Sequence, residues 1–170
     1  MEPVDIYDCN RNKKGYIKIR GRDRLEPGEF IIGVGALLIN SDQKILISKR
    51  TMNKDRYPGY WEFSGGGVAQ GEESADAVVR EKKEELGINL NKEDGYLLKT
   101  FKNDYKFFDL WAFKVDVKVQ DLVLAEREVE KAEWVDFDKI EELKEQNIFA
   151  DSSRITLQDF EIAKKVLLDN

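Results

Sequence analysis

Apolar positions along the chain follow two spacings, and polar or glycine-containing segments separate them. Short apolar or alternating runs, bounded by turn residues, predict strands at residues 30–40, 45–50, 60–64, 96–101, 105–117 and 131–137. Apolar positions at helical spacing predict helices at residues 73–86, 137–146 and 156–168. Thr156, with Asp159 in the following turn, is typical of a helix start.

The order of these elements predicts the fold class. Strands and helices are mixed without strict βαβ alternation, which favours an α/β (α+β) sandwich around one mixed sheet. We expect residues 45–50 to pair with residues 30–40, residues 96–101 and 105–117 to form a hairpin, and the glycines at 65–67 to form a turn. Residues 1–28 are polar and turn-rich, and we expect a short hairpin around Tyr16–Arg20 there. No linker or repeat divides the chain, so we expect a single domain over 1–170, with 1–28 as an N-terminal extension.

Composition excludes a membrane span and indicates a reducing compartment. Hydrophobic residues make up 41% of the 170 residues and charged residues 36%, as in soluble globular proteins. The apolar run at 31–39 is far shorter than the roughly 20 residues that a membrane helix needs. The first residues lack a secretory signal, and Cys9, the single cysteine, allows no internal disulfide. We therefore expect a cytoplasmic protein.

Charge and the absence of histidine exclude several function classes. A net charge of −6 argues against broad nucleic-acid binding, which needs a basic face. The chain has no histidine, which excludes histidine-based triads, histidine acid–base catalysis and histidine-ligated zinc. One cysteine is too few for a thiolate zinc site. Catalytic groups and metal ligands must come mainly from Asp, Glu, Lys, Tyr, Ser or Cys9.

The helix expected at residues 73–86 carries an unusual acidic cluster. One narrow stripe is apolar and should pack on the sheet, formed by Ala75, Val78, Val79 and Leu86. Glu81, Glu84 and Glu85 lie on an adjacent face, and Gly87 is placed to end the helix. Like charges at this spacing destabilise a helix by roughly 0.2–0.5 kcal/mol per pair. Such a cluster beside glycine carbonyls suits a hard cation such as Mg²⁺.

The complete spacing resembles the signature of the Nudix hydrolase family, G-x5-E-x7-R-E-U-x-E-E-x-G-U, where U is a bulky apolar residue. The matching positions are Gly66, Glu72, Arg80, Glu81, Glu84, Glu85, Gly87 and Ile88. Segments within 45–67 and 128–135 also look like family segments, so the resemblance extends over residues 30–146. It implies a MutT-like α/β/α sandwich and Mg²⁺-dependent hydrolysis of a phosphoanhydride. The implied substrate is a nucleoside diphosphate linked to another moiety, and modified nucleoside triphosphates are included.

The resemblance also implies roles for the signature residues. Glu81, Glu84 and Glu85 would bind one to three Mg²⁺ or Mn²⁺ ions together with the carbonyl of Gly66. Which glutamate is the base stays open, although the position of Glu81 has that role in many family members. Glu84 belongs to the same catalytic set. Arg80 and Glu72 would form a supporting pair that orients the helix and Glu81.

Residues outside the signature complete the site that the resemblance implies. Glu128, six residues before Trp134, would join the metal ligands from a later loop, with Glu126 and Glu130 as rivals. Arg50, at the end of a strand, would contact a substrate phosphate, and a solvated surface arginine is an equal alternative. Trp61 and Phe63 share one face of a strand beside the glycines. They could bind substrate by stacking on a base, but we favour packing in the core.

Lys82 departs from the signature, which has an apolar residue at this position. Either its stem packs and its ammonium reaches solvent, or it pairs with a nearby acid. We favour the first interpretation. In the second, Lys82 would neutralise a metal ligand and lower the affinity for metal.

Three rival functions are weaker. The N-terminal segment resembles the Nudix branch that contains isopentenyl diphosphate isomerase, but that isomerase needs histidine ligands and a core cysteine, which this chain lacks. A non-catalytic nucleotide-binding domain would usually have lost signature acids, and all four are present. RNA decapping is disfavoured by the acidic balance. Homodimers are common in the family, and the sequence leaves that question open.

Overall fold

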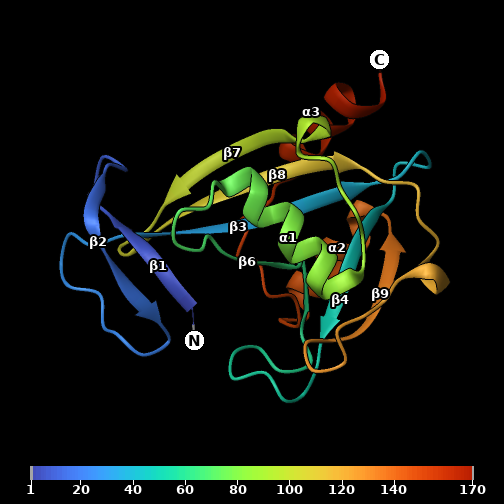
Figure 1. Cartoon of the computed structure of the whole chain (residues 1–170). Helices are drawn as coiled ribbons and strands as arrows, with labels where there is room; N and C mark the ends of the chain where they lie inside the picture. Colours follow the sequence, from blue (N-terminus) through green and yellow to red (C-terminus); the bar gives the residue numbers. More distant parts are fainter. Residues whose placement is uncertain (1, 170) are drawn as a thin grey trace.

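A mixed sheet forms the centre of the computed structural model, which describes residues 2–169 (Figure 1). Its strand order is β5 (Trp61–Glu62), β4 (Ile45–Arg50), β3 (Ile31–Ile39), β8 (Lys106–Lys114) and β7 (Tyr96–Lys102). β3 and β8 run parallel in register from Ile31↔Lys106 to Ile39↔Lys114. Two further strands join this sheet, β6 (Gly65–Gly67) beside β3 and β9 (Val129–Val135) beside β4. The predicted mixed fold is confirmed.

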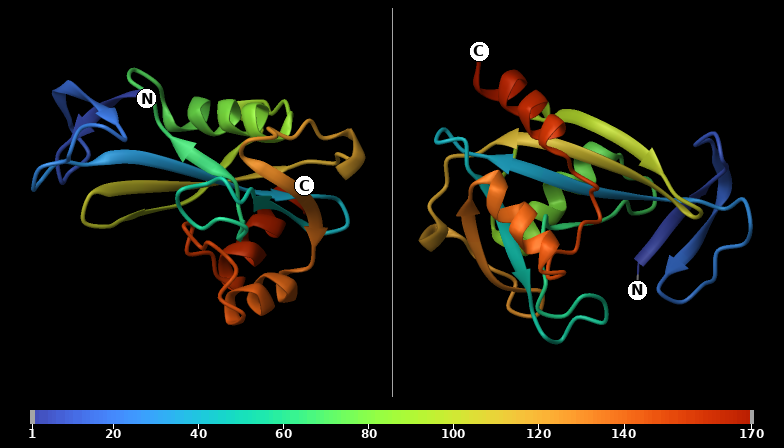
Figure 2. Two further views of the ribbon diagram at one scale, coloured as in Figure 1. Left: turned by 90° about the horizontal axis from the view of Figure 1, so that it is seen from below. Right: turned by 180° about the vertical axis from the view of Figure 1, so that it is seen from behind.

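Helices cover both faces of the sheet. α1 (Ser74–Leu86) lies on one face, and α2 (Phe137–Glu145) and α3 (Leu157–Leu168) lie on the other (Figure 2). The described residues also include short 3₁₀ turns at Lys92–Asp94 and Val119–Asp121. The central strand β3 serves both layers because its side chains alternate. Val34, Ala36 and Leu38 pack toward α1, whereas Leu37 and Ile39 pack toward α2 and α3. Burial on both faces explains its nearly continuous apolar sequence.

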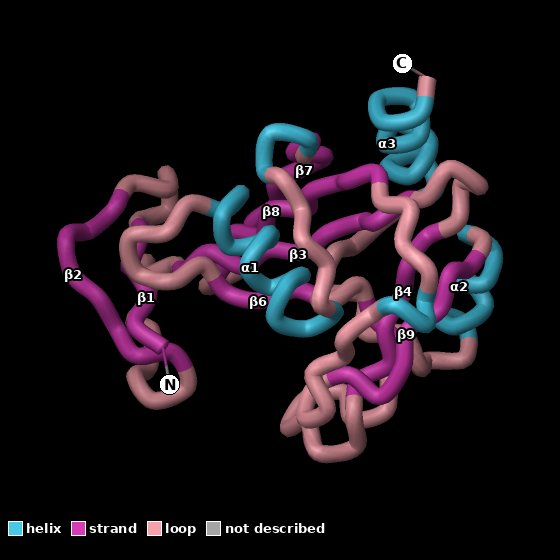
Figure 3. Tube along the Cα trace, turned by 45° about the vertical axis from the view of Figure 1, so that its right-hand side comes forward, coloured by secondary structure: helices cyan, strands magenta, loops and turns pink. Residues whose placement is uncertain are grey.

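The N-terminal segment forms a larger hairpin than the sequence predicted. β1 (Glu2–Tyr7) pairs with β2 (Lys13–Arg20) as a separate two-stranded sheet beside the main one (Figure 3). Backbone hydrogen bonds of 2.8 and 2.9 Å join Tyr7 and Phe30. Arg11 Nη1 donates to the buried carboxylate of Asp109 at 2.8 Å. These contacts fix the hairpin against the core.

The prediction of a turn at residues 65–67 was wrong. The three glycines form β6, which pairs antiparallel with β3 from Gly33 to Gly35. A side chain would block this approach, because a Cβ on Gly65 would lie 2.2 Å from the carbonyl oxygen of Val34. β4 therefore contacts β3 in register only at Ile39↔Ile45, and its main partner is β9.

Helix positions agree with the sequence predictions more closely than strand ends do. α3 begins after Thr156, and Thr156 and Asp159 form a reciprocal capping box. The strand expected to reach residue 117 ends at Lys114, and the one expected at 131–137 is β9. No helix among residues 2–169 is long and apolar enough to span a membrane.

Candidate active site

The helix α1 presents a buried face that differs from the predicted stripe. Its buried residues are Ala77, Val78, Glu81, Lys82, Glu85 and Leu86, whereas Ala75 and Val79 are only half-buried. The reason is the glycine strand β6, which lets the acidic side of the helix approach closely. A Cβ on Gly66 would lie 2.0 Å from Glu81 Oε1. The left-handed Gly87, with φ of 71°, ends the helix as predicted.

The signature acids line one cavity. Glu81 and Glu85 are only 8% and 7% exposed, and Glu84 is exposed. All three border a cavity of about 570 Å³, together with Gly66 and Glu128. The structure therefore brings together the whole set of residues that the resemblance assigned to metal binding.

Arg80 organises the acids from the side of the helix. Its Nε and Nη2 donate to the two carboxylate oxygens of Glu72 at 2.9 and 3.0 Å, and Nη2 also donates to the carbonyl of Gly67 at 3.0 Å. Its Nη1 lies 2.9 Å from Glu81 and 3.2 Å from Glu84. Burial alone would raise the pKa of Glu72, but hydrogen bonds from Arg80 and the Ala69 amide leave that pKa lowered. The Arg80–Glu72 pair thus stays charged and ties α1 to the glycine strand.

Neighbouring positive charges do not fully offset the burial of the Glu81 and Glu85 carboxylates. Burial raises the pKa of Glu81 despite Arg80, and it raises the pKa of Glu85 to about 7 despite Lys82. Glu85 Oε2 is buried, and no group among the described residues donates a hydrogen bond to it. A buried carboxylate oxygen that accepts no hydrogen bond is costly, so a cation bound nearby would stabilise Glu85.

Lys82 lies beneath the acids and does not reach solvent. Its side chain is fully buried, and its ammonium contacts both the hydroxyl and the carbonyl of Ser64 and lies 3.7 Å from Glu85 Oε2. Burial lowers the pKa of Lys82, and the neighbouring acids oppose that effect. The favoured interpretation, a snorkelling ammonium, was wrong, because α1 packs this position against the core. The alternative, pairing with an acid, is what the structure shows.

The donor set fits a hard divalent cation. Mg²⁺ and Mn²⁺ prefer oxygen donors, and the cavity offers the carbonyl of Gly66 and the carboxylates of Glu81, Glu84, Glu85 and Glu128. Among residues 2–169, no three acid, histidine or cysteine side chains are already gathered at ligand distance. Arg80 instead bridges Glu81 and Glu84.

Glu128 is the acid of the later loop that borders this cavity. Its carboxylate pairs with Lys54 at 2.7 Å, and it remains 47% exposed at the cavity edge. Glu130 pairs with Lys49 at 2.9 Å, and Glu126 is exposed; neither borders the cavity. The geometry favours Glu128 over its two rivals.

The expected substrate-contacting residues divide between the cavity and the core. Arg50 borders the cavity, but its Nη1 donates to both oxygens of Glu62, at 2.7 and 2.8 Å. Trp61 and Phe63 are buried in the core cluster beside α2 and α3. Phe63 also borders a smaller side cavity of about 240 Å³, whereas Trp61 borders none of the cavities at this site. Core packing thus accounts for Trp61, and a substrate role for it has no support in the geometry.

The sequence reasoning missed four cations at the site. We call the cavity of about 570 Å³ that the signature acids line the acid-rich cavity. Two side cavities, of about 240 and 400 Å³, adjoin it. The four cations that border one or more of these cavities are Arg20, Lys54, Arg56 and Lys106. They come from β2, from the loop after β4 and from the start of β8. No local spacing links these positions, since only the docking of the hairpin brings Arg20 to the site.

Comparison of the sequence and the structure with known proteins identifies the family of this chain. The NUDIX domain model matches residues 29–156. An uncharacterized Nudix hydrolase of Listeria monocytogenes is 34% identical over 150 residues, covering 88% of each chain. The crystal structure of DR0079 from Deinococcus radiodurans covers 95% of this chain and 99% of its own, with a TM-score of 0.76 and 19% identity, which is a likeness of fold. The chain belongs to the Nudix family and is a Nudix hydrolase.

The family assignment carries general chemistry with it. Nudix hydrolases act on nucleoside diphosphate derivatives and generally use divalent metals. An isopentenyl-diphosphate Delta-isomerase of Photorhabdus laumondii is 36% identical over 109 residues, covering 62% of this chain and 61% of its own. This similarity agrees with the likeness to that branch, but the missing histidines still exclude the isomerase's metal ligands here.

Proposed function

We propose that this protein hydrolyses a phosphoanhydride bond in a nucleoside diphosphate linked to another moiety, with Mg²⁺ or Mn²⁺ as cofactor. One observation carries the proposal: the signature acids Glu81, Glu84 and Glu85 share a cavity with Gly66 and Glu128, and Glu85 has a buried oxygen that accepts no hydrogen bond from the described residues. These residues would hold the cation. When bound, the cation supplies neutralisation of charge on the phosphate oxygens.

The chain's own residues supply the proton transfer. Water attacks one phosphorus, a new P–O bond forms, and the anhydride P–O bond breaks, so each product retains a phosphate. We assign Glu81 as the general base that accepts the proton of the attacking water. Its carboxylate borders the cavity, and the 2.9 Å contact with Arg80 Nη1 orients it. Glu72 supports this arrangement by holding Arg80.

A substrate panel tests the proposal. The purified protein is incubated with ADP-ribose, nucleotide sugars, dinucleoside polyphosphates and oxidised or ordinary nucleoside triphosphates, in Mg²⁺, in Mn²⁺ and in EDTA. We expect release of phosphate or a nucleoside monophosphate from at least one substrate with metal, and none in EDTA. Absence of any product across the panel with either metal contradicts the proposal, as does equal turnover in EDTA.

A further inference from the structure

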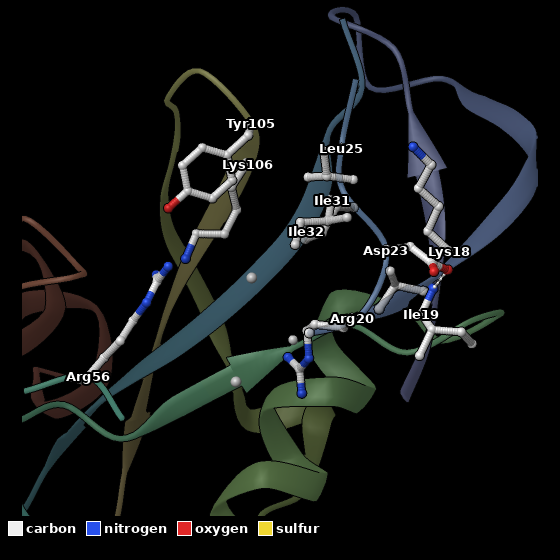
Figure 4. Close-up of a pocket in the computed structure, with 15 residues that line it drawn as sticks. Lys18, Ile19, Arg20, Asp23, Leu25, Ile31, Ile32, Arg56, Tyr105 and Lys106 are labelled. Atoms are coloured by element: carbon white, nitrogen blue, oxygen red, sulfur yellow. Dashed lines mark hydrogen bonds between the residues drawn. The ribbon is translucent and has the colours of Figure 1, made fainter. Parts of the chain in front are cut away.

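Three cations from distant parts of the sequence line the cavities at the acids. Arg20 ends β2, Arg56 lies in the loop after β4, and Lys106 begins β8 (Figure 4). Arg20 and Arg56 border the acid-rich cavity and both cavities next to it, and Lys106 borders the latter two. These three residues, the cation cluster, therefore stand where the acid-rich cavity opens into its neighbours.

Nearby carboxylates do not balance the positive charges of the cation cluster. Arg20 Nη2 lies 2.8 Å from Glu2 Oε2, but among the described residues no acid pairs with the side chain of Arg56 or Lys106. Figure 4 shows the ends of Arg56 and Lys106 pointing toward each other. Burial, and then the charges of Arg56 and Arg20, lower the pKa of Lys106. Three positive groups that line the same two cavities, in a chain of net charge −6, indicate a place for an anion.

The position of Arg20 is set by the docked hairpin. Gly67 leaves room for it, because a Cβ there would lie 1.8 Å from Arg20 Nη1. The contacts of Tyr7 with Phe30 and of Arg11 with Asp109 hold the hairpin on the core. The backbone of Arg20 is thus held beside the site before any ligand binds, and its ion pair with Glu2 holds the exposed side chain.

The cavity between the hairpin and the sheet adjoins the cation cluster. It measures about 400 Å³, within the usual range of about 300–1,000 Å³ for small-molecule sites. Apolar and aromatic side chains form much of its wall, among them Ile19, Leu25, Ile31 and Tyr105. Its one acid, Asp23, already accepts a hydrogen bond from the Ile19 amide at 2.7 Å. A group of nucleoside size suits this volume and lining.

We propose that Arg20, Arg56 and Lys106 bind a phosphate of the substrate that is not under attack, and that the hairpin cavity receives the organic group attached to it. The inference rests on the proposed function and deepens it. The substrate enters with its scissile anhydride at the acids, its neighbouring phosphate on the cation cluster and its nucleoside under the hairpin. The hairpin, which lies wholly outside the part matched by the family model, thereby becomes a determinant of substrate choice.

Binding without turnover tests the cation cluster. Inorganic pyrophosphate is titrated calorimetrically into the metal-free protein in EDTA at low ionic strength. We expect Arg56→Gln and Lys106→Met each to weaken binding about tenfold or more, since each removes a charge-assisted hydrogen bond. Arg56 is exposed on a loop, so its substitution leaves the fold intact. The control is Lys114→Met, an exposed lysine at the other end of β8, which should bind as the unmodified protein does. Equal affinity in all four proteins overturns the assignment.

A second comparison tests the hairpin cavity. ADP, GDP, CDP and UDP are titrated under the same conditions, and at least one should bind more tightly than pyrophosphate. Leu25→Trp fills the cavity from a loop, so it should abolish that gain and leave pyrophosphate binding unchanged. If Leu25→Trp leaves nucleoside diphosphate affinity unaltered, the cavity does not hold the nucleoside. If the hydrolysis panel fails while pyrophosphate still requires Arg56 and Lys106, the proposed reaction falls and the phosphate subsite stands.

Discussion

Replacement of Lys82 by methionine should tighten the binding of a divalent cation. The ammonium lies 3.7 Å from Glu85 Oε2 and is fully buried, so it competes with a metal for the same carboxylate. Two unit charges about 4 Å apart interact by about 4 kcal/mol at an effective dielectric constant of 20, which sets a ceiling of roughly a thousandfold in affinity. A third of that energy, about 1.4 kcal/mol, gives a tenfold gain. We expect the gain to lie between these limits.

The assay is a titration of Mn²⁺ at pH 7.5, in which electron paramagnetic resonance reports the free ion. Lys83→Met is the matched control, because Lys83 is the next residue on α1 and is exposed. Lys83→Met also removes one positive charge, but water screens that charge. The substitution should therefore change the affinity for Mn²⁺ little. An affinity in Lys82→Met equal to or below that of the unmodified protein would refute the idea that Lys82 competes with the metal.

Three further expectations concern the acids and their supports. Glu72→Gln removes the charged partner of Arg80, so the free energy of unfolding should fall by about 1–3 kcal/mol in urea and turnover should drop. Gly66→Ala places a Cβ 2.0 Å from Glu81 Oε1; since that carboxylate can rotate away, turnover should be lost with circular dichroism unchanged. The folded pKa of Glu85 is about 7 and its ordinary value 4.5, so the folded protein holds an extra proton between them. The stability of metal-free protein should therefore fall as the pH rises through that window, and the fall should be smaller in Glu85→Gln.

The sequence predicted the parts of this fold that local pattern determines. The three helices follow from apolar spacing, and the cap of α3 follows from Thr156 and Asp159. Strand pairing was harder because it depends on partners far apart in the chain. The parallel pairing of β3 with β8 and the antiparallel pairing of β3 with Gly65–Gly67 have no local signature. Three consecutive glycines usually indicate a turn, and here they permit backbones to approach closely.

The candidate site also combines features that local sequence predicts with features that depend on distant parts of the chain. A fixed spacing on one helix identified the acids, whereas the burial of Glu81, Lys82 and Glu85 depends on how closely α1 approaches β6. Helical arithmetic placed the acids beside the packed face, and the structure places two of them within it. Arg20 and Lys106 could not be found from spacing, because the docked hairpin and the register of β8 bring them together.

The metal-site assignment is tested most directly by the turnover of two glutamate variants on the best substrate of the panel, in saturating Mg²⁺. Glu85→Gln alters the acid whose buried oxygen accepts no hydrogen bond, and Glu130→Gln alters an exposed acid that pairs with Lys49 away from the cavity. We expect kcat to fall by about a hundredfold or more in Glu85→Gln, because a metal ligand is lost, and to stay near the unmodified value in Glu130→Gln. Near-normal kcat in a folded Glu85→Gln protein would contradict the assignment of these acids as the centre of a metal-dependent phosphoanhydride hydrolase.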